Sequence, residues 1–517
     1  MERDHPLNRR RFLSAALVGL APKTDPPIAG SFVNDSAELG HRLRSRGPFH
    51  PPARRERVPL VIVGGGMAGL TAAWRLQKRG FRDFVLLEME KQAGGVARWG
   101  ENAITAFPWG AHYVPVPGPK SLLIRELLAD LGVLADGRWE ERYLCFSPQE
   151  RLFLHGKWQD GIEPEVAATR RDHEQYRRFE RRMAEYRASG QFTIPMARAA
   201  TPPDPALDRI SIADWLRREA FDSPYLNWYV NYACRDDYGA LAEDTSAWAG
   251  IHYFASREPD EKGPLTWPEG NGWVVRRLLE RLGDCVRTGA LVCRIVRDGS
   301  RVRILTEDVE YEAEAVVFAA PTFLAPYLMD DAPPAGEFEY SPWLTANLVV
   351  ERPPLERSSE LELAWDNVIY NSPTLGYVVA THQSLRSFEG SSVWTFYWAL
   401  AEGPPARNRK LLLSTDWAWW RDAILDDLAR AHPGIRQCVS RIDIMRLGHA
   451  MVRPRVGFLS SDQRRRAADW RGPVFFAHSD LSGFSIIEEA QHRGVTAADR
   501  ALAHLGGGGR RPAGAAP

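Results

Sequence analysis

The clearest order of apolar and polar segments along the chain lies between residues 58 and 88. Residues 58–63 form a short apolar run rich in valine and isoleucine, which is typical of a buried parallel strand. A helix-like stretch follows at 67–80, and a second apolar run at 84–87 predicts the next strand. Strand, helix and strand in this order are typical of an α/β fold with a parallel sheet.

Three glycines occupy the turn between the first predicted strand and the helix. Gly64, Gly66 and Gly69 have the G-x-G-x-x-G spacing, in which the first glycine allows a tight turn and the second lets the backbone approach a pyrophosphate. The third lets helix and strand pack closely. Glu88 ends the second strand, where a carboxylate suits a ribose 2′-hydroxyl. Together these features predict a Rossmann-type dinucleotide site.

Four further segments indicate which dinucleotide the site binds. They hold a second glycine pair with a basic residue (91–98), a Trp-Gly-Ala stretch (109–113), a glycine turn followed by a helix and strands (268–321), and an acid before a final helix (476–494). In this order they resemble the flavin-containing amine oxidase family and its relatives, the protoporphyrinogen oxidases and carotenoid desaturases. The resemblance therefore implies that the dinucleotide is FAD.

The same resemblance implies a Rossmann-type FAD-binding domain with an inserted mixed α+β substrate domain. It implies that Asp480 holds the ribitol, that the backbone of Val292 meets the adenine, and that the last helix points its N-terminus at the flavin. The residues carried over as FAD-binding are Gly64, Gly66, Gly69, Glu88, Gly94, Gly95, Arg98, Gly110, Ala111, Val292, Asp480 and Ile487.

The FAD-domain segments recur in three parts of the chain, so the substrate domain must be built from the insertions between them. The predicted FAD domain comprises residues 58–135, 265–335 and 440–505, and the predicted substrate domain comprises 136–264 and 336–439. Residues 31–57 are interpreted as a linker. Residues 506–517, which are mostly Gly, Pro, Arg and Ala, are interpreted as a disordered tail.

Residues 1–30 are interpreted as a signal region. Two arginines, any residue and two apolar residues (9–13) fit the twin-arginine pattern, and the apolar run to Ala21 is too short to span a bilayer. The predicted partner is the twin-arginine export machinery, which carries folded proteins, and the predicted location is the periplasm. A proline directly after Ala21 disfavours cleavage there, so an uncleaved membrane anchor stays an alternative.

Composition narrows the possible partners. The 66 basic and 66 acidic residues cancel, and this balance points to neither nucleic acid nor an anionic membrane surface. Five cysteines are scattered without C-x-x-C or metal-ligand spacing, so we predict no metal site and no disulfide framework. The remaining partners are a small-molecule substrate and either oxygen or a periplasmic electron acceptor.

Two features depart from the family pattern. Amine oxidases of this family usually place a lysine near the flavin on a strand that corresponds here to 344–350, and this run has no lysine. Ile486 and Ile487 stand where an aromatic residue is common. These departures leave the prediction of FAD binding intact and put ordinary monoamine oxidation in doubt.

Weak catalytic candidates remain elsewhere in the sequence. His449 is interpreted either as a proton acceptor or as a structural histidine. Asp236 and Asp237 form an acid pair beside aromatic residues, which suits a di- or polyamine or, alternatively, a structural ion pair. Arg453 is a candidate for a substrate carboxylate or for a salt bridge.

Three functions follow from these observations. The first is an exported FAD-dependent oxidoreductase that oxidises a C–N bond of an amine, such as a polyamine or amino-acid derivative, by hydride transfer to the flavin. The second is a desaturase, isomerase or porphyrinogen-type oxidase acting on an apolar polyene or ring, which the missing lysine and the two isoleucines favour. The third is a non-catalytic flavin-binding or electron-transfer protein.

Overall fold

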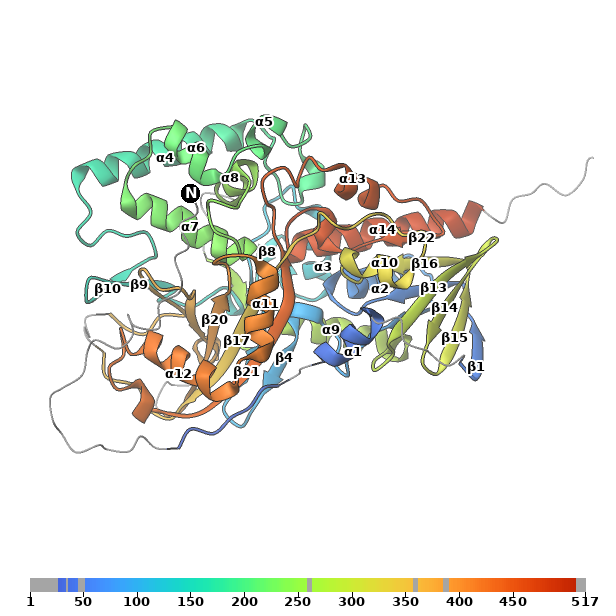
Figure 1. Cartoon of the computed structure of the whole chain (residues 1–517), viewed down its shortest axis with the longest axis horizontal. Helices are drawn as coiled ribbons and strands as arrows, with labels where there is room; N and C mark the ends of the chain where they lie inside the picture. Colours follow the sequence, from blue (N-terminus) through green and yellow to red (C-terminus); the bar gives the residue numbers. More distant parts are fainter. Residues whose placement is uncertain are drawn as a thin grey trace, which may run out of the picture.

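The structure, a computed structural model, describes residues 27–33, 36–44, 52–257, 263–356, 361–384 and 390–507. The arginine pair of the predicted signal and the end of the predicted tail lie outside these residues. Two regions are apparent in Figure 1: a parallel sheet with its helices, and a larger region that combines a long sheet with a group of helices. Among the described helices, none combines the length and the apolar character that crossing a membrane requires.

A five-stranded parallel sheet forms the centre of the first region, as the apolar runs predict. Its order is β12-β3-β2-β16-β22, and its strands come from the three parts of the chain that the sequence assigns to the FAD domain. The strands are β2 (Leu60–Val63), β3 (Phe84–Leu87), β12 (Val286–Arg287), β16 (Ala315–Phe318) and β22 (Val474–Phe476). The central three are buried on both faces because helices cover the sheet.

Helices α2 (Met67–Lys78) and α14 (Ile487–Gly507) pack against each other beside this sheet (Figure 1). Glycines permit the close contacts. A β-carbon on Gly69 would lie 1.9 Å from the carbonyl oxygen of Gly64, and one on Gly494 would lie 2.2 Å from that of Ala68. Helix–strand and helix–helix packing here therefore both require glycine. Also present are α3 (Leu122–Asp130), α9 (Gly272–Leu282), α10 (Ala325–Leu328) and α13 (Asp462–Ala468).

A second sheet of the FAD domain has the order β1-β15-β14-β13. Its strands are β1 (Arg54–Arg57), β13 (Val292–Asp298), β14 (Arg301–Thr306) and β15 (Val309–Ala313). The segment interpreted as a linker thus contributes strand β1 and also helix α1 (Ala37–Arg44). The sequence of this segment is polar because β1 is an edge strand and α1 buries only Leu43, so the apolar pattern that would predict a strand and a helix is missing.

The substrate region contains a seven-stranded sheet of order β10-β9-β18-β19-β20-β17-β21. Its strands are β9 (Glu150–Leu154), β10 (Lys157–Asp160), β17 (Tyr340–Val350), β18 (Asp366–Ile369), β19 (Gly376–Val379), β20 (Ser392–Ala399) and β21 (Val439–Val452). Helices α11 (Pro405–Ser414) and α12 (Trp417–Leu428) bury one face of it. The opposite face carries the aromatic residues described below.

Three small two-stranded ribbons are also present. They pair β4 (Trp99–Glu101) with β5 (Ala106–Pro108), β6 (Tyr113–Val114) with β11 (Leu265–Thr266), and β7 (Leu134–Ala135) with β8 (Arg138–Trp139).

Five helices complete the substrate region (Figure 1). They are α4 (Arg170–Ala188), α5 (Pro205–Asp208), α6 (Ile212–Arg218), α7 (Pro224–Tyr238) and α8 (Ala247–Ala255). Helix α4 begins at a capping box between Thr169 and Asp172, which explains why its charged sequence still has a sharp start.

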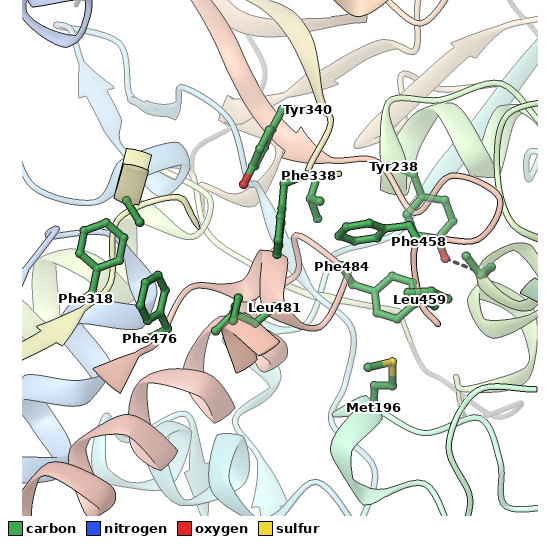
Figure 2. Packing of buried hydrophobic residues seen from close by; sticks show 14 of the residues in the cluster. Met196, Tyr238, Phe318, Phe338, Tyr340, Phe458, Leu459, Phe476, Leu481 and Phe484 are labelled. Atoms are coloured by element: carbon green, nitrogen blue, oxygen red, sulfur yellow. Dashed lines mark hydrogen bonds between the residues drawn. The ribbon is translucent and has the colours of Figure 1, made fainter. Parts of the chain in front are cut away.

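One hydrophobic cluster joins these helices to the parallel sheet. Figure 2 shows Phe318 and Phe476 of the sheet at one end and Tyr238 and Met196 of the helical region at the other, with Phe338, Phe458 and Phe484 between them. Because buried apolar contacts resist rearrangement, this cluster fixes the helical region relative to the FAD domain.

Substitution of Gly69 tests the close packing of α2. We expect Gly69→Ala to lower the free energy of unfolding by about 1–3 kcal/mol, since its β-carbon would overlap the Gly64 carbonyl. Thermal unfolding of the purified variant measures the change. The matched control is Gly434→Ala, whose added carbon meets no atom within 4 Å. Equal melting temperatures for both variants would contradict the packing role.

Candidate active site

A large cavity of about 710 Å³ lies at the carboxyl ends of strands β2, β3 and β16. The N-terminal end of α2, helices α1 and α11 and strand β21 complete its wall. This is the edge of an open α/β sheet at which nucleotides bind. Nine of the residues assigned from sequence line it: Gly64, Gly66, Glu88, Gly94, Gly95, Arg98, Ala111, Val292 and Ile487.

The glycine turns give the cavity its floor. Gly64 has a φ of +105°, which only glycine adopts readily, and its N–H donates to the carbonyl of Leu87. Gly94 and Gly95 also have positive φ values, and Gly66 pairs with Gly94. A β-carbon on Gly66 would meet nothing closer than 3.9 Å, so the space above it stays open for a ligand.

Glu88 and Arg98 hold these turns in place. The Glu88 carboxylate accepts hydrogen bonds from the N–H groups of Gly65 at 2.6 Å and Glu90 at 2.8 Å. Burial raises the pKa of Glu88 despite these two bonds. Arg98 donates to the carbonyl of Gly95 at 3.0 Å and lies 3.6 Å from Glu90. Both side chains therefore hold the backbone of the glycine turns by hydrogen bonds and also line the cavity.

Three residues assigned to the cofactor from sequence do not line the cavity. Gly69 serves helix packing, and Gly110 allows a close approach to the carbonyl of Val96, 2.2 Å from its missing β-carbon. Asp480, the predicted ribitol ligand, is fully buried. Its neighbours in the chain, His478 and Ser479, line the cavity instead.

The carboxylate of Asp480 has partners within the protein. It accepts hydrogen bonds from the Thr322 N–H at 2.8 Å, the Thr322 hydroxyl at 2.7 Å and the Tyr340 hydroxyl at 2.5 Å. His478 Nδ1 lies 3.1 Å away. Burial opposes ionisation, yet the charge of His478 and these bonds lower the pKa of Asp480. A charged carboxylate thus fastens the segment that leads to α14, rather than projecting into the cavity.

An unpaired acceptor lies in the cavity wall. The Asn271 side chain donates to the carbonyl of Tyr113, and its Oδ1 is buried without a hydrogen-bond partner among the described residues. Such an atom is costly to bury unless a ligand supplies a donor. Together with the open space above Gly66, it fits a large dinucleotide with ring N–H groups.

Aromatic rings line the region next to Ala111. The ring of His112 stacks on Tyr397 at 4.6 Å and lies 5.5 Å from that of Trp365. Tyr397 donates to the carbonyl of Gly110 at 2.9 Å. Burial lowers the pKa of His112 to about 4, so its imidazole is neutral near pH 7. These rings do not line the cavity; they form an aromatic cluster next to Ala111, which does line it, and we call this cluster the aromatic chamber.

Carboxylates stand behind this aromatic chamber. Asp236 on α7 and Asp366 on β18 lie deep in the protein, yet each keeps some accessible surface. Neither forms an ion pair with any described side chain. Burial, together with the charges of Asp237 and Glu150, raises the pKa of Asp236 to about 7. Burial and the same Glu150 raise the pKa of Asp366 well above its usual value. Both acids are therefore held in a setting that disfavours their charged form, although the charges of Arg257 and Arg235 partly oppose this shift at Asp236.

The other half of the predicted acid pair is neutralised. Asp237 accepts two hydrogen bonds from Arg257, at 3.0 and 3.1 Å, and the guanidinium also lies 3.8 Å from the centre of the Tyr253 ring. Glu488 lies near this pair, is buried, and has one oxygen without a partner in the described chain. Burial raises the pKa of Glu488 to about 7. The structure thus separates the roles of the two adjacent aspartates.

His449 and Arg453 lie away from the aromatic chamber. The His449 ring stacks on Phe323 at 4.4 Å, on the side of the cavity that faces α1 and α11. Burial and nearby Arg409 lower its pKa to about 3, so it is a weak base. Arg453 is buried and pairs with Glu339 at 2.8 Å and Asp244 at 2.7 Å, as a structural salt bridge does.

A family model described as flavin-containing amine oxidoreductase matches residues 67–502. The chain belongs to this family. Family membership identifies FAD as the cofactor and places the chain among the FAD-dependent oxidoreductases. Among the described residues, no group of His, Cys, Asp and Glu side chains could hold a metal ion.

The individual proteins to which the chain is similar are named for different activities. An L-amino acid dehydrogenase of Synechocystis sp. is 22% identical over 332 residues, which cover 61% of this chain and 65% of that protein. A hydroxyneurosporene desaturase of Cereibacter sphaeroides is 29% identical over 295 residues, covering 48% of this chain and 52% of that protein. The match thus spans less than two thirds of each of these curated relatives. A solved structure of putrescine oxidase bound to putrescine has a TM-score of 0.66 at 18% identity, covers 87% of this chain and all of that one, and shows the same fold.

Several residues of the site were missed in the sequence. Asp366 follows Trp365 at the start of a strand, and nothing in its neighbourhood of the sequence distinguishes it from a surface acid. Helix α11 brings Arg409 to the cavity from a segment assigned to the substrate domain. Only the long-range pairing of strands brings these residues to the site, and local patterns do not encode it.

Filling the space above Gly66 tests the cofactor site. We expect Gly66→Val to fold and to purify without the yellow colour of FAD, since the apoprotein has room for the side chain but the pyrophosphate then does not. The absorbance near 450 nm relative to that at 280 nm measures the bound flavin, and circular dichroism checks the fold. A folded variant with stoichiometric FAD would overturn the assignment.

Proposed function

We propose that the protein oxidises a C–N bond of a cationic amine, with FAD as the acceptor of the hydride equivalent. The observation that carries this proposal is the pair of carboxyl groups of Asp236 and Asp366 behind the aromatic chamber, which form no ion pair with a described side chain and whose pKa values burial raises. A buried carboxylate without a partner is unfavourable, and a bound ammonium group removes that cost. The putrescine bound by the structural relative is itself a dicationic amine, which is in keeping with this proposal.

The aromatic rings suit the same substrate. Tyr232 and Tyr397 both lie in the electric field of Asp236 and Asp366, and the rings of Trp365 and His112 lie beside Tyr397. Ring faces attract alkylammonium groups and pack against methylene groups. A chain with one nitrogen near Ala111 and a second cation near the acids fits this arrangement, as a diamine or polyamine does.

FAD supplies the electron-accepting chemistry when it is bound. The protein excludes water with its aromatic walls and holds the substrate cation at the acids. The substrate ammonium must lose a proton before its C–H bond can be oxidised. Asp236, whose pKa lies near 7, is suited to accept a proton at the far end of the chamber.

Anaerobic reduction of the bound flavin is the first test. We expect diamines and polyamines to bleach the flavin absorbance, with an aldehyde and an amine or ammonia as products after hydrolysis of the imine. Amino acids, polyenes and porphyrinogens serve as the comparison panel. Bleaching by polyenes alone would overturn the amine proposal.

Replacement of Asp236 tests how the cation is held. We expect Asp236→Asn to raise KM for a diamine at least about tenfold, equivalent to about 1.4 kcal/mol, with a smaller change in kcat. In the wild type, kcat/KM should rise with pH through about 7 as the carboxylate ionises, and the variant should lack this rise. The control is Asp83→Asn, an exposed acid of the FAD domain.

Stability gives a second readout of Asp236 that is independent of turnover. The folded protein holds the Asp236 proton more tightly than the unfolded chain does, so the free energy of unfolding falls as pH rises from about 4 to about 7. We expect Asp236→Asn to be more stable than the wild type at pH 8, by about 1–4 kcal/mol, and the gain to shrink as pH falls. An unchanged difference between pH 5 and pH 8 would count against a strained carboxylate.

A polyene or ring substrate is the second candidate. The aliphatic side chains of Ile486 and Ile487, which line the cavity, favour it, and so does the apolar aromatic chamber. Two buried carboxylates at the far end of that chamber disfavour an uncharged substrate. The comparison panel above distinguishes the two candidates.

We also propose that the protein is exported to the periplasm by the twin-arginine route, on the basis of the arginine pair and the short apolar run that follows it. In a bacterium with this pathway, the full chain should reach the periplasmic fraction, and the double variant Arg9→Lys, Arg10→Lys should stay in the cytoplasm. Cytoplasmic retention of the unaltered chain would contradict the proposal.

A further inference from the structure

A group of basic side chains forms the outer edge of the cofactor cavity. His41 and Arg44 come from α1, Arg409 and Lys410 from α11, and Arg446 from β21; all five line the cavity. We call this group the cationic rim. His41, Arg44 and Lys410 are exposed, so the cavity reaches the surface at this point.

The rim has few compensating charges. Arg44 and Lys410 form no hydrogen bond or ion pair with any described side chain, and Arg409 donates only to the backbone carbonyl of Tyr340. The acids that line the cavity are Glu88 and Glu90, and both are engaged at the glycine turns. Burial lowers the pKa of Arg409, the positive charge of Arg44 lowers it further, and Glu339, which is paired with Arg453, partly opposes the shift. Positive groups held together in this way attract an anion.

Strand β21 separates the rim from the acidic chamber. Its pairing with β17 shifts register between Leu447 and Met451, so residues 448–450 form an irregular stretch. Leu447 and Met451 pack with the aromatic chamber, whereas His449 stacks on Phe323 toward α1 and α11. The aromatic chamber therefore lies on one side of this strand, and the positively charged opening of the cavity lies on the other.

We propose that the cationic rim binds an anionic electron acceptor that re-oxidises the reduced flavin. A cationic amine is repelled from the rim and attracted to the acidic chamber, while an anion has the opposite preference. The two half-reactions thus use different sides of strand β21. The proposal concerns FAD and its oxidant, and it does not depend on the identity of the amine.

The electron balance of the step is simple. Reduction of the flavin stores two electrons, and re-oxidation passes both to the acceptor. An acceptor of one electron is consumed as two molecules, and the protons leave to solvent. With hexacyanoferrate(III), a trianion, two molecules of hexacyanoferrate(II) form for each flavin.

Stopped-flow re-oxidation of the holoenzyme tests the rim. The flavin is first reduced with dithionite, so that no amine is needed, and is then mixed with hexacyanoferrate(III) or with neutral benzoquinone. We expect Arg409→Glu, Lys410→Glu and the double variant to slow the reaction with hexacyanoferrate(III), the double variant at least tenfold at low salt. The rate with benzoquinone should change less than twofold. The matched control is Arg407→Glu, an exposed arginine of the same helix that does not line the cavity.

Salt dependence in the unaltered protein provides a test that needs no variant. Added salt should slow re-oxidation by hexacyanoferrate(III) and leave that by benzoquinone unchanged. Equal salt effects on the two oxidants, or equal losses of both rates in the double variant, would overturn the proposal. So would loss of FAD from the Glu variants, because the rim would then be binding the phosphates of the cofactor.

Discussion

The buried carboxylate of Asp480 is the constraint on which the arrangement of the site depends. It binds Thr322, which follows a strand of the parallel sheet, and Tyr340, which begins the long strand of the substrate region. It thereby ties three distant parts of the chain together at the cavity. Because a buried ionised group is stable only with such partners, any shift of one part leaves the charge unsatisfied. The hydrophobic cluster of Figure 2 includes Tyr340, which donates to Asp480, and Leu481, its neighbour in the chain, and this packing holds both in place.

Acidic and basic side chains are concentrated at different places around Asp480. The net formal charge of the protein is zero, but these local groups are not balanced one against the other. Carboxylates gather behind the aromatic rings, and guanidinium groups gather at the opening near α1 and α11. Since Coulomb interactions are strong where water is excluded, the acids act on what binds beside the aromatic rings, and the cationic rim acts on what enters the opening. In the proposed function, the acids select the cation and the cationic rim selects the anion.

The parallel sheet and its first glycine turn were predicted well because their signals are local. Gly64, Gly66 and the strand at 84–87 lie where the spacing places them, and nine of the assigned residues line the cavity. The role of Asp480 could not be predicted in this way. The sequence identifies an acid before the last helix, but hydrogen bonds from Thr322 and Tyr340 determine the direction of its side chain. Asp366 and Arg409 were missed because only strand pairing and helix docking across the substrate region bring them to the site.

The N-terminal segment has a consequence for how the protein is made. Residues 29 and 32 pair with Arg441 and Ile444 of β21, and α1 then crosses to the cofactor cavity. During synthesis, residues 29 and 32 therefore cannot form these pairs until strand β21 has been made, more than 400 residues later. Until strand β21 exists, this wall of the cavity is missing. The cofactor cavity is therefore complete only after most of the chain has been synthesised.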